Sequence, residues 1–309
     1  MRAELRAARG GRVVVIGGAN TDLVGIADAA LVERDSNPGH VRVSPGGVAR
    51  NIAENLVRLG ADVEFVGAFG DDEAGRELMA ACSASGIGLA GSERVRGAAG
   101  ARYLAIAGPD GDMALALNDM RVLDAMTPEW LGQRAGVLGE AELVVIDANL
   151  PGEAIEWVVA RSSAPVLAEP VSVAKAVRLR PVLERLAAIT PNALEAEVLL
   201  EGGSPDEVWA ADGLVGAGVG AAFVTAGAGG SAWAGREGSG KQSAVPTEVV
   251  STTGAGDAYA AGVAYAMLAG LSASGCAALG AGCSAVALAS ERTVSESMSL
   301  DAALAAIGE

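Results

Sequence analysis

Histidine is nearly absent from this chain, which holds one in 309 residues, His40. A single histidine argues against Ser-His-Asp and Cys-His catalysis and against metal sites built from several histidines. Any acid or base chemistry must therefore come from carboxylates. Cysteine is also sparse: Cys82, Cys276 and Cys283 form no Cys-x-x-Cys pair, and their odd number does not suit a disulfide framework. A reducing, cytoplasmic compartment is expected.

Basic and aromatic side chains are scarce as well. The net charge is −16, and aromatic residues make up 3% of the chain while apolar residues make up 51%. An acidic surface without a basic stripe repels a phosphate backbone, so a nucleic-acid polymer is not an expected partner, although backbone N–H groups can still bind a small anion. No charge-free run is long enough for a membrane span. The core must be built from Ala, Val, Leu and Gly.

Short β-branched runs alternate with helical patterns along most of the chain. The runs lie at 12–18, 63–67, 143–146, 165–168 and 222–225, and the helical patterns lie at 49–59, 73–85, 153–161 and 174–186. Continuous apolar strands joined by crossover helices predict an α/β fold with a doubly wound, mostly parallel sheet flanked by helices.

Two stretches break this alternation. Residues 22–43 and 94–117 have extended, alternating patterns with turn sequences such as SNPG and GPDGD. They predict a small antiparallel β lid attached to the main sheet. Residues 1–11 carry arginines but no apolar run and are expected to be a frayed tail, so that residues 12–309 form one domain with its lid.

The segment TTGAGDA at 252–258 precedes a long helix of small residues. Its glycines allow backbone N–H groups to converge on an anion at the helix N-terminus, where the helix dipole also favours negative charge. Asp257 would lie beside that anion and could accept a proton from an attacking hydroxyl. Taken alone, however, such a segment is more typical of an ordinary glycine-rich turn before a helix.

The same segment resembles the C-terminal signature of the ribokinase (PfkB) family of carbohydrate and nucleoside kinases, and the similarity extends from about residue 14 to 288. The resemblance implies the ribokinase-like fold and transfer of the ATP γ-phosphoryl group to a substrate hydroxyl. It implies that Asp257 is the catalytic base and that the backbone of Gly254, Ala255 and Gly256 stabilises the moving phosphoryl group. A non-catalytic nucleoside-binding protein is the remote alternative.

The resemblance also assigns residues to the substrate. SPGGVARN at 44–51 resembles the N-terminal signature of the family, and NTD at 20–22 matches its early Asn-x-Asp, although that tripeptide could equally cap a loop. The carboxylate of Asp22 would hold sugar hydroxyls through charge-assisted hydrogen bonds. The substrate-binding residues implied in these segments are Asn20, Asp22, Gly46, Gly47 and Asn51.

A second group of matches lies on the ATP side. TPNALE at 190–195 resembles the Asn-x-x-Glu element of the family, in which Glu195 helps to position Mg²⁺ and Asn192 faces the phosphates and the metal. The same residues can also be read as the start of a capped helix. VTAGAGG at 224–230 matches the strand end that lines the polyphosphate. The cofactor-binding residues implied are Asn192, Thr225, Gly227, Gly230, Lys175 and Gly282.

Further stretches resemble the members of the family that phosphorylate C-nucleosides. DSNPG at 35–39, NDM at 118–120 and EPVS at 169–172 carry this similarity. It implies transfer to a ribose 5′-hydroxyl, with Asn118, Asp119 and Asn149 as additional substrate-binding residues. A kinase of the same fold that acts on ribose, adenosine or another sugar is the alternative.

Two residues depart from the family pattern. Ser251 stands where ribokinases carry an Asp that contributes to a monovalent-cation site, which puts activation by such a cation in doubt. Glu169 replaces the Asp of an Asp-Pro pair, and the sequence does not define its role.

Cys283 is expected near the adenine pocket as a buried, structural residue.

One motif is a decoy. GREGSGK at 235–241 has the Gly-x4-Gly-Lys spacing of a phosphate-binding P-loop. Gln242 occupies the Ser/Thr position, and no long helix follows. A β-hairpin is therefore predicted.

The lid segments carry a pattern that bears on assembly. Apolar residues alternate around Leu104, Ile106, Leu115 and Leu117. An exposed apolar sheet of this kind would allow a homodimer to form through the lid, as relatives often do.

Overall fold

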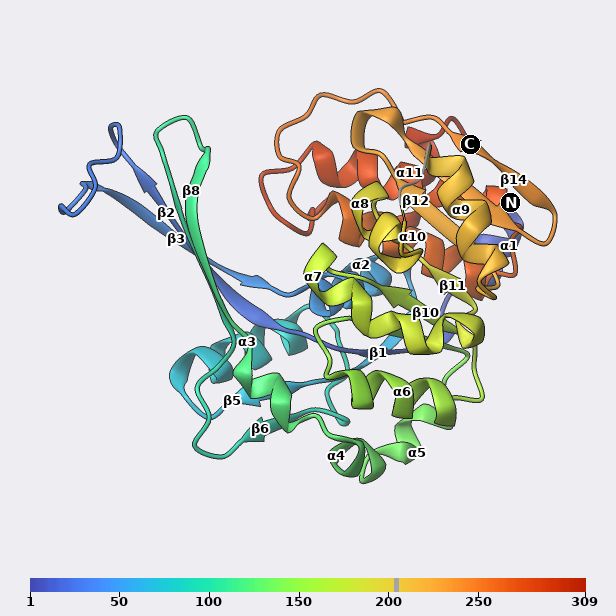
Figure 1. Cartoon of the computed structure of the whole chain (residues 1–309), viewed down its shortest axis with the longest axis horizontal. Helices are drawn as coiled ribbons and strands as arrows, with labels where there is room; N and C mark the ends of the chain where they lie inside the picture. Colours follow the sequence, from blue (N-terminus) through green and yellow to red (C-terminus); the bar gives the residue numbers. More distant parts are fainter. Residues whose placement is uncertain (203–205) are drawn as a thin grey trace.

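The main sheet forms the centre of the molecule. The computed structural model describes residues 1–202 and 206–309, and in these residues eight strands form a sheet in the order β14-β13-β12-β11-β10-β9-β1-β4 (Figure 1). The parallel strands are β1 Arg12–Ile16, β4 Asp62–Val66, β9 Leu143–Asp147, β10 Val166–Glu169, β11 Ala188–Ile189 and β12 Ala222–Thr225. The antiparallel strands β13 Ser231–Gly235 and β14 Gly238–Gln242 complete one edge. The predicted mostly parallel sheet is confirmed.

Both faces of the sheet are covered by helices, because its strands are apolar at successive positions. Val13 and Val15 point into one core, whereas Val14 and Ile16 point into the other. The first core is covered by α1 Arg2–Ala7, α2 Val48–Leu59, α3 Glu73–Ala84, α10 Ala255–Leu268, α11 Ala273–Leu288 and α12 Leu300–Ala306, and the second by α4 Pro128–Gly132, α5 Ala135–Leu138, α6 Gly152–Arg161, α8 Ala193–Leu199 and α9 Glu207–Gly216.

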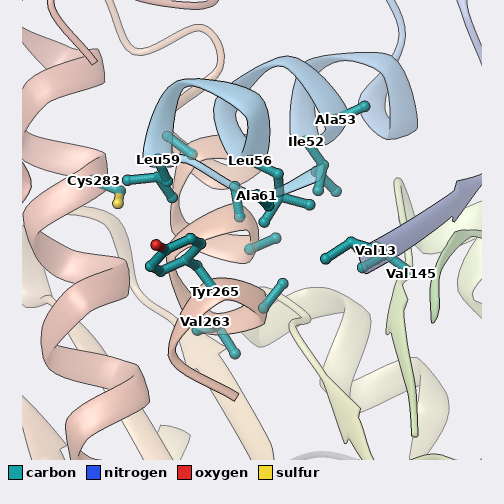
Figure 2. Close-up of a cluster of buried hydrophobic side chains, with 14 of the residues drawn as sticks. Val13, Ile52, Ala53, Leu56, Leu59, Ala61, Val145, Val263, Tyr265 and Cys283 are labelled. Atoms are coloured by element: carbon teal, nitrogen blue, oxygen red, sulfur yellow. The ribbon is translucent and has the colours of Figure 1, made fainter. Parts of the chain in front are cut away.

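Small residues allow the helices of the first core to approach closely. Figure 2 shows α2 above this core, with Leu56 and Leu59 directed towards Tyr265 of α10. A Cβ added to Gly262 of α10 would lie 2.9 Å from both the Cα of Gly280 and the Sγ of Cys283 in α11. This contact explains how a chain with few aromatic rings fills its interior, since backbone replaces side-chain volume.

A smaller sheet projects from the main body (Figure 1). Its strands are β2 Asn20–Ala27, β3 Gly39–Gly46, β7 Arg102–Ala107 and β8 Met113–Asp119, in the order β3-β2-β7-β8. The β2–β3 and β7–β8 pairs are antiparallel, but β2 and β7 are parallel. The expected lid strands are present, but the expectation of an antiparallel sheet was wrong at its centre. Each segment forms its own hairpin, and the two hairpins join through their first strands.

Alternation along these strands gives the small sheet two unlike faces. One row across the four strands is apolar and consists of Val43, Leu23, Leu104 and Leu117. The adjacent row, on the opposite face, consists of Ser44, Asp22, Tyr103 and Asn118. The side chains of Val43 and Leu117 are both 62% exposed. The first row therefore forms part of an uncovered apolar face, whereas the second row places polar side chains on the opposite face of the small sheet.

Two local expectations were wrong. The chain before β1 is not frayed: its α1 helix buries Leu5 completely, and the Tyr265 hydroxyl donates a 3.1 Å hydrogen bond to the Leu5 carbonyl. The helix expected over 174–186 is a short α7 Val173–Ala176 followed by a 3₁₀-helix, η2 Val177–Arg185. Pro181 lies inside this segment and removes a backbone donor, which disfavours a regular α-helix.

The remaining elements are short. A two-stranded sheet joins β5 Ala68–Gly70 and β6 Glu93–Val95, and 3₁₀ turns form η1 Arg121–Ala125 and η3 Gly227–Gly229. The P-loop decoy is the β13–β14 hairpin, in which Gly235 pairs with Gly238, so the predicted hairpin is confirmed. Within the described ranges no helix is both long and apolar enough to cross a membrane.

Candidate active site

Gly254 and the first turn of α10 Ala255–Leu268 form the helix start at which the sequence predicts an anion cradle. Gly254 precedes the helix with a φ of +83°, and a Cβ there would collide with the carbonyl oxygen of Thr293. Only glycine adopts this conformation without strain in such a confined place. The first N–H groups of a helix have no partners within it. Here the Ala255 N–H donates a 3.4 Å hydrogen bond to the Thr252 carbonyl, so an anion would bind at the N–H groups of Gly256 and Asp257. The helix start predicted at Gly254, Ala255 and Gly256 is present, and its role as an anion cradle stays a prediction.

Asp257 lies in the same turn. Its Oδ2 accepts a 2.7 Å hydrogen bond from Nδ2 of Asn51, which lies in the first turns of α2. Burial raises the pKa of Asp257 to about 7, and the charges of Asp147 and Asp22 add to this rise, while the Asn51 hydrogen bond and the Arg50 charge oppose it. A carboxylate with a pKa near neutrality is suited to accept a proton.

Asp147, which the sequence interpretation missed, organises this region. It ends strand β9, is completely buried, and accepts hydrogen bonds from the backbone N–H groups of Gly18 at 3.2 Å and Ala49 at 3.0 Å. Nδ2 of Asn149 donates a further bond of 2.7 Å to the carboxylate. Asp147 therefore ties the end of β1 to the start of α2. The available signal was a carboxylate directly after a run of buried apolar residues.

The predicted substrate residues of β2 and β3 come together at the base of the small sheet. Nδ2 of Asn20 donates a 2.5 Å hydrogen bond to Oδ1 of Asp22, and burial raises the pKa of Asp22. A Cβ on Gly46 would collide with the Asp22 carboxylate, and Gly47 has a φ of +101°. These glycines leave the Asp22 carboxylate room beside the backbone. Asp22 thus lies beside the glycine pair that leads to Asn51.

A cavity of about 370 Å³ lies between the end of β8 and the loops after β9 and β10. Its lining residues are Asn118, Met120, Arg121, Asp124, Asn149, Pro151, Gly152, Lys175 and Arg178. Nζ of Lys175 lies 2.5 Å from Oδ1 of Asn149. Lys175, expected with the nucleotide, thus lines the same cavity as Asn118 and Asn149, which were expected with the substrate.

Asp119 does not line this cavity. Its carboxylate forms a 2.5 Å ion pair with Arg121, and hydrogen bonds from Arg121 hold the pKa of Asp119 down at about 2. The resemblance of NDM at 118–120 had grouped it with Asn118 as a substrate-binding residue. Neighbours along a strand point to opposite faces of a sheet.

A larger cavity of about 610 Å³ begins at the anion cradle. Its walls are Thr225, Gly227, Ala228, Gly230, Ser231, Ala244, Val245, Pro246, Thr247, Val249, Thr252, Ala255, Gly256, Tyr259, Ala281, Ser284, Ala285 and Leu288. The predicted nucleotide residues Thr225, Gly227 and Gly230 therefore share one cavity with the cradle. Ser284 contributes a hydroxyl that donates a 2.8 Å hydrogen bond to the Ala255 carbonyl. The sequence interpretation missed the loop from Ala244 to Val249.

Gly282 and Cys283 do not line this cavity. A Cβ on Gly282 would collide with the carbonyl oxygen of Ala303 in α12, so this glycine serves helix packing, and its expected contact with the nucleotide was wrong. Cys283 is completely buried beside Gly262, and burial raises the pKa of its thiol to about 12. The interpretation of Cys283 as a buried residue holds, because a thiol so buried stays protonated.

Asn192 and Glu195 form a reciprocal cap at the start of α8. The Glu195 N–H donates to Asn192 Oδ1 and the Asn192 N–H donates to Glu195 Oε2, both at 2.9 Å. A bridge pairs Asn192 with Thr225 at the wall of the large cavity. The interpretation of Asn192 and Glu195 as the capped start of a helix is therefore correct. The bridge to Thr225 places this cap near the predicted nucleotide residues.

Glu169 adds a further carboxylate at this edge of the sheet. Burial raises its pKa well above the usual value, and the charges of Glu195 and Asp257 raise it further. Among the described residues no three His, Cys, Asp or Glu side chains are close enough to hold a metal ion by themselves. A divalent cation that brings phosphate and water oxygens as additional ligands would fit here, because it relieves the repulsion between these carboxylates.

A glycine-rich helix start beside a buried carboxylate, with two cavities at the carboxyl ends of the strands of a doubly wound sheet, suits an enzyme that transfers a phosphoryl group. Residues 11–299 match the pfkB family of carbohydrate kinases, and the chain belongs to this family. It is an ATP-dependent phosphotransferase with the ribokinase-like fold.

Similar proteins support this assignment. The pseudouridine kinase of Escherichia coli is 34% identical over 293 residues, which cover 93% of this chain and 94% of that protein. A putative sugar kinase from Clostridium perfringens has 28% identity and a TM-score of 0.84, over 97% of this chain and 96% of its own. A ribokinase from Thermotoga maritima has 20% identity and a TM-score of 0.86, over 97% of this chain and 99% of its own.

Proposed function

We propose that the protein is a pseudouridine kinase, which transfers the γ-phosphoryl group of ATP to the ribose 5′-hydroxyl of pseudouridine. The observation that carries this choice is the similarity to the Escherichia coli enzyme, which extends over nearly the full length of both chains. It includes the small sheet and the loops around the 370 Å³ cavity, where a nucleoside base would lie. A kinase that acts on free ribose has no need of a cavity beyond the sugar.

The substrate would lie between the polar face of the small sheet and the main body. Asp22 and Asn20 would bind ribose hydroxyls, with Asn51 beside the 5′-hydroxyl. The base would enter the cavity lined by Asn118, Asn149 and Lys175. Donors there suit the two carbonyl oxygens of a uracil ring.

ATP would occupy the 610 Å³ cavity, with its phosphates at the cradle of Gly254 to Gly256. Asp257 then accepts the 5′-hydroxyl proton as the oxygen attacks phosphorus, while backbone N–H groups stabilise the charge on the phosphoryl group. Glu195 and Asn192 would hold Mg²⁺ together with the nucleotide. The metal supplies charge neutralisation on the phosphate oxygens.

The apolar face of the small sheet supports assembly as a homodimer. Val41, Val43, Leu115 and Leu117 are all more than 60% exposed, and they lie on strands β3 and β8 of one sheet. Single exposed apolar residues are ordinary, but a contiguous face of this kind marks a contact surface. A second copy of the chain would cover it.

The buried, unpaired cysteines agree with a reducing, cytoplasmic compartment.

A substrate panel tests the proposal. ADP formation is measured with pseudouridine, uridine, adenosine and ribose at equal concentrations, with Asp257→Asn as the control for catalysis. Pseudouridine should give the highest kcat/KM, and Asp257→Asn should still bind nucleoside but lose most turnover. A preference for free ribose would favour the ribokinase-like alternative, which the Thermotoga maritima structure keeps open.

A further inference from the structure

The side chains of Asp147 and Lys175 carry opposite charges and are joined through the amide of Asn149. Nδ2 of Asn149 donates a 2.7 Å hydrogen bond to Oδ2 of Asp147, and Oδ1 of the same amide accepts a 2.5 Å hydrogen bond from Nζ of Lys175. Asn149 and Lys175 line the smaller cavity, whereas Asp147 is completely buried at the end of β9. The three side chains form a relay that leads from the interior to this cavity.

The carboxylate of Asp147 is surrounded by donors. Its Oδ1 accepts from the Asn149 N–H at 3.1 Å, its Oδ2 accepts from the Ala49 N–H at 3.0 Å, and the Gly18 N–H lies 3.3 and 3.2 Å from the two oxygens. Burial raises the pKa of this carboxyl, but every one of its hydrogen bonds comes from a donor and favours the ionised form. Asp147 therefore acts on Asn149 as an acceptor.

The two charges fix the orientation of the Asn149 amide. An amide has N–H donors at one end and a carbonyl acceptor at the other, while a carboxylate only accepts and an ammonium group only donates. A rotated amide would place its oxygen against the carboxylate of Asp147 and its nitrogen against the ammonium of Lys175. Both hydrogen bonds would be lost, and buried polar groups would be left without partners. Asp147 thus determines that the oxygen of Asn149 faces Lys175.

The surroundings of Asn149 hold it in this place. A Cβ on Gly18 would lie 2.9 Å from Nδ2 of Asn149, so the backbone after β1 packs directly against the amide. Nη1 of Arg178 donates hydrogen bonds of 3.0 to 3.1 Å to three successive carbonyl oxygens, those of Ala148, Asn149 and Leu150. Asn149 is therefore held at its backbone by Arg178 and flanked at its amide by Gly18.

Lys175 has donors left for a ligand. An ammonium group carries three N–H donors, and Asn149 accepts from one of them. Within residues 1–202 and 206–309, Nζ of Lys175 makes no further hydrogen bond or ion pair. The remaining N–H groups are thus available to a carbonyl oxygen of a base in the smaller cavity.

We propose that Asp147 is a positioning residue for the nucleoside. It fixes the amide of Asn149, and Asn149 in turn holds the ammonium of Lys175 at the cavity, where it donates to a carbonyl oxygen of the base. The inference rests on the proposed function, because it needs a base in this cavity. A lysine side chain loses much rotamer freedom when it is ordered, and an ammonium already held in place avoids that cost during binding.

A cycle of single and double variants tests whether Asp147 acts through Lys175. The experiment measures kcat/KM for pseudouridine at saturating ATP, and the KM for ATP. Lys175→Met should lower kcat/KM about tenfold in the wild-type background but no more than about twofold in the Asp147→Asn background, where the ammonium is no longer held. The KM for ATP should stay near the wild-type value in all these variants.

Glu64→Gln provides the matched control. Glu64 is also a buried carboxylate of the main sheet, and it accepts a 2.6 Å hydrogen bond from the Gly91 N–H, but it lines neither cavity. Lys175→Met should therefore keep its full effect of about tenfold in the Glu64→Gln background, because independent sites contribute separately. This comparison separates the loss of a buried carboxylate from the loss of the relay.

Melting temperatures show whether Asp147→Asn folds. If it does not, Asn149→Leu replaces it in the cycle, since that variant breaks the relay and leaves the carboxylate in place. Losses that multiply in the cycle, or an unchanged kcat/KM in Lys175→Met, would overturn the inference. A wild-type enzyme that prefers ribose to pseudouridine would refute the proposed function, whereas multiplied losses in an enzyme that prefers pseudouridine would refute only the relay.

Discussion

Nδ2 of Asn51 lies 2.7 Å from Oδ2 of Asp257, and this hydrogen bond joins the first turns of two helices that are 206 residues apart in the sequence. The other amide atom, Oδ1 of Asn51, is buried and has no partner among the described residues. A buried amide oxygen without a donor is costly. Asn51 can therefore donate to the base and accept from a substrate hydroxyl at the same time.

Asn51→Leu tests this double role. The substitution removes a hydrogen bond to the ionised form of Asp257, so the pKa of Asp257 should rise and the pH at which activity appears should rise with it. Hydrogen bonds to charged groups contribute about 1.5–3 kcal/mol, so kcat/KM near pH 7 should fall about ten- to a hundredfold. A pH–rate profile measures both effects. A neighbouring change, Asn55→Leu, would separate general damage to α2 from the loss of this bond.

Gly254→Ala should damage both folding and catalysis. The φ of +83° and the nearby Thr293 carbonyl leave no room for a Cβ, so we expect a loss of about 1–3 kcal/mol in the free energy of unfolding and a large loss of kcat. Gly256→Ala is the matched control, because open space surrounds its Cβ position. Urea unfolding should show little or no destabilisation of that control. Equal destabilisation of both variants would contradict the strained cradle.

Lys175→Met distinguishes the two cavities. Its Nζ is hydrogen bonded to Asn149 in the smaller cavity, so the KM for the nucleoside should rise about tenfold or more while the KM for ATP stays near the wild-type value. Initial rates with each substrate varied in turn give both constants. If the KM for ATP rises instead, Lys175 acts on the nucleotide, as the sequence interpretation implied.

Asp257→Asn should make the protein more stable at alkaline pH. The folded-state pKa of Asp257 is raised to about 7, above the unfolded value, so the folded chain binds more protons and loses stability as pH rises towards 7. The amide of the variant does not ionise, so its free energy of unfolding does not fall in this way as pH rises. Its melting temperature without ATP should exceed that of the wild type by about 2–4 °C at pH 8, with a smaller gap at pH 5. Asp110→Asn, at an exposed turn, controls for the loss of one acidic charge.

Leu117→Glu tests the proposed dimer. Leu117 is 62% exposed on the apolar face of the small sheet, and a carboxylate there would be buried without a partner if a second copy covered this face. Light scattering after size-exclusion chromatography should then report a monomer. Val177→Glu, which changes an apolar residue 43% exposed on η2, should leave the assembly as it is in the wild type. A wild-type protein that is itself monomeric would contradict the proposal.

Local patterns were sufficient for much of the fold. The buried strands at 12–16 and 143–147 are short β-branched runs, and their parallel pairing follows from the helices between them. The glycines at 254 and 256 predicted a turn that leads into a helix, and only the family pattern indicated more than an ordinary turn there. What could not be predicted is non-local: the parallel pairing of β2 with β7 joins strands about 80 residues apart, and no single segment encodes it.

The same distinction applies to the site. Only the family pattern assigned Asn51 to the substrate and Asp257 to catalysis. The two side chains meet in the structure, and their meeting depends on how α2 packs against α10. Asp147 escaped notice because a carboxylate at the end of an apolar run also occurs at an ordinary exit from a strand. Gly282 was misassigned because a glycine that serves helix packing and one that serves a ligand look alike in sequence.

The contact between Gly262 and Gly280 has a mechanical consequence. It brings the helix that carries Asp257 against the helix that lines the larger cavity at backbone distance, with the buried thiol of Cys283 beside the contact. We therefore expect α10 and α11 to move as one unit. Opening and closing during a turnover cycle is then expected of the projecting sheet, and the flexibility of its two hairpins would affect how fast product leaves.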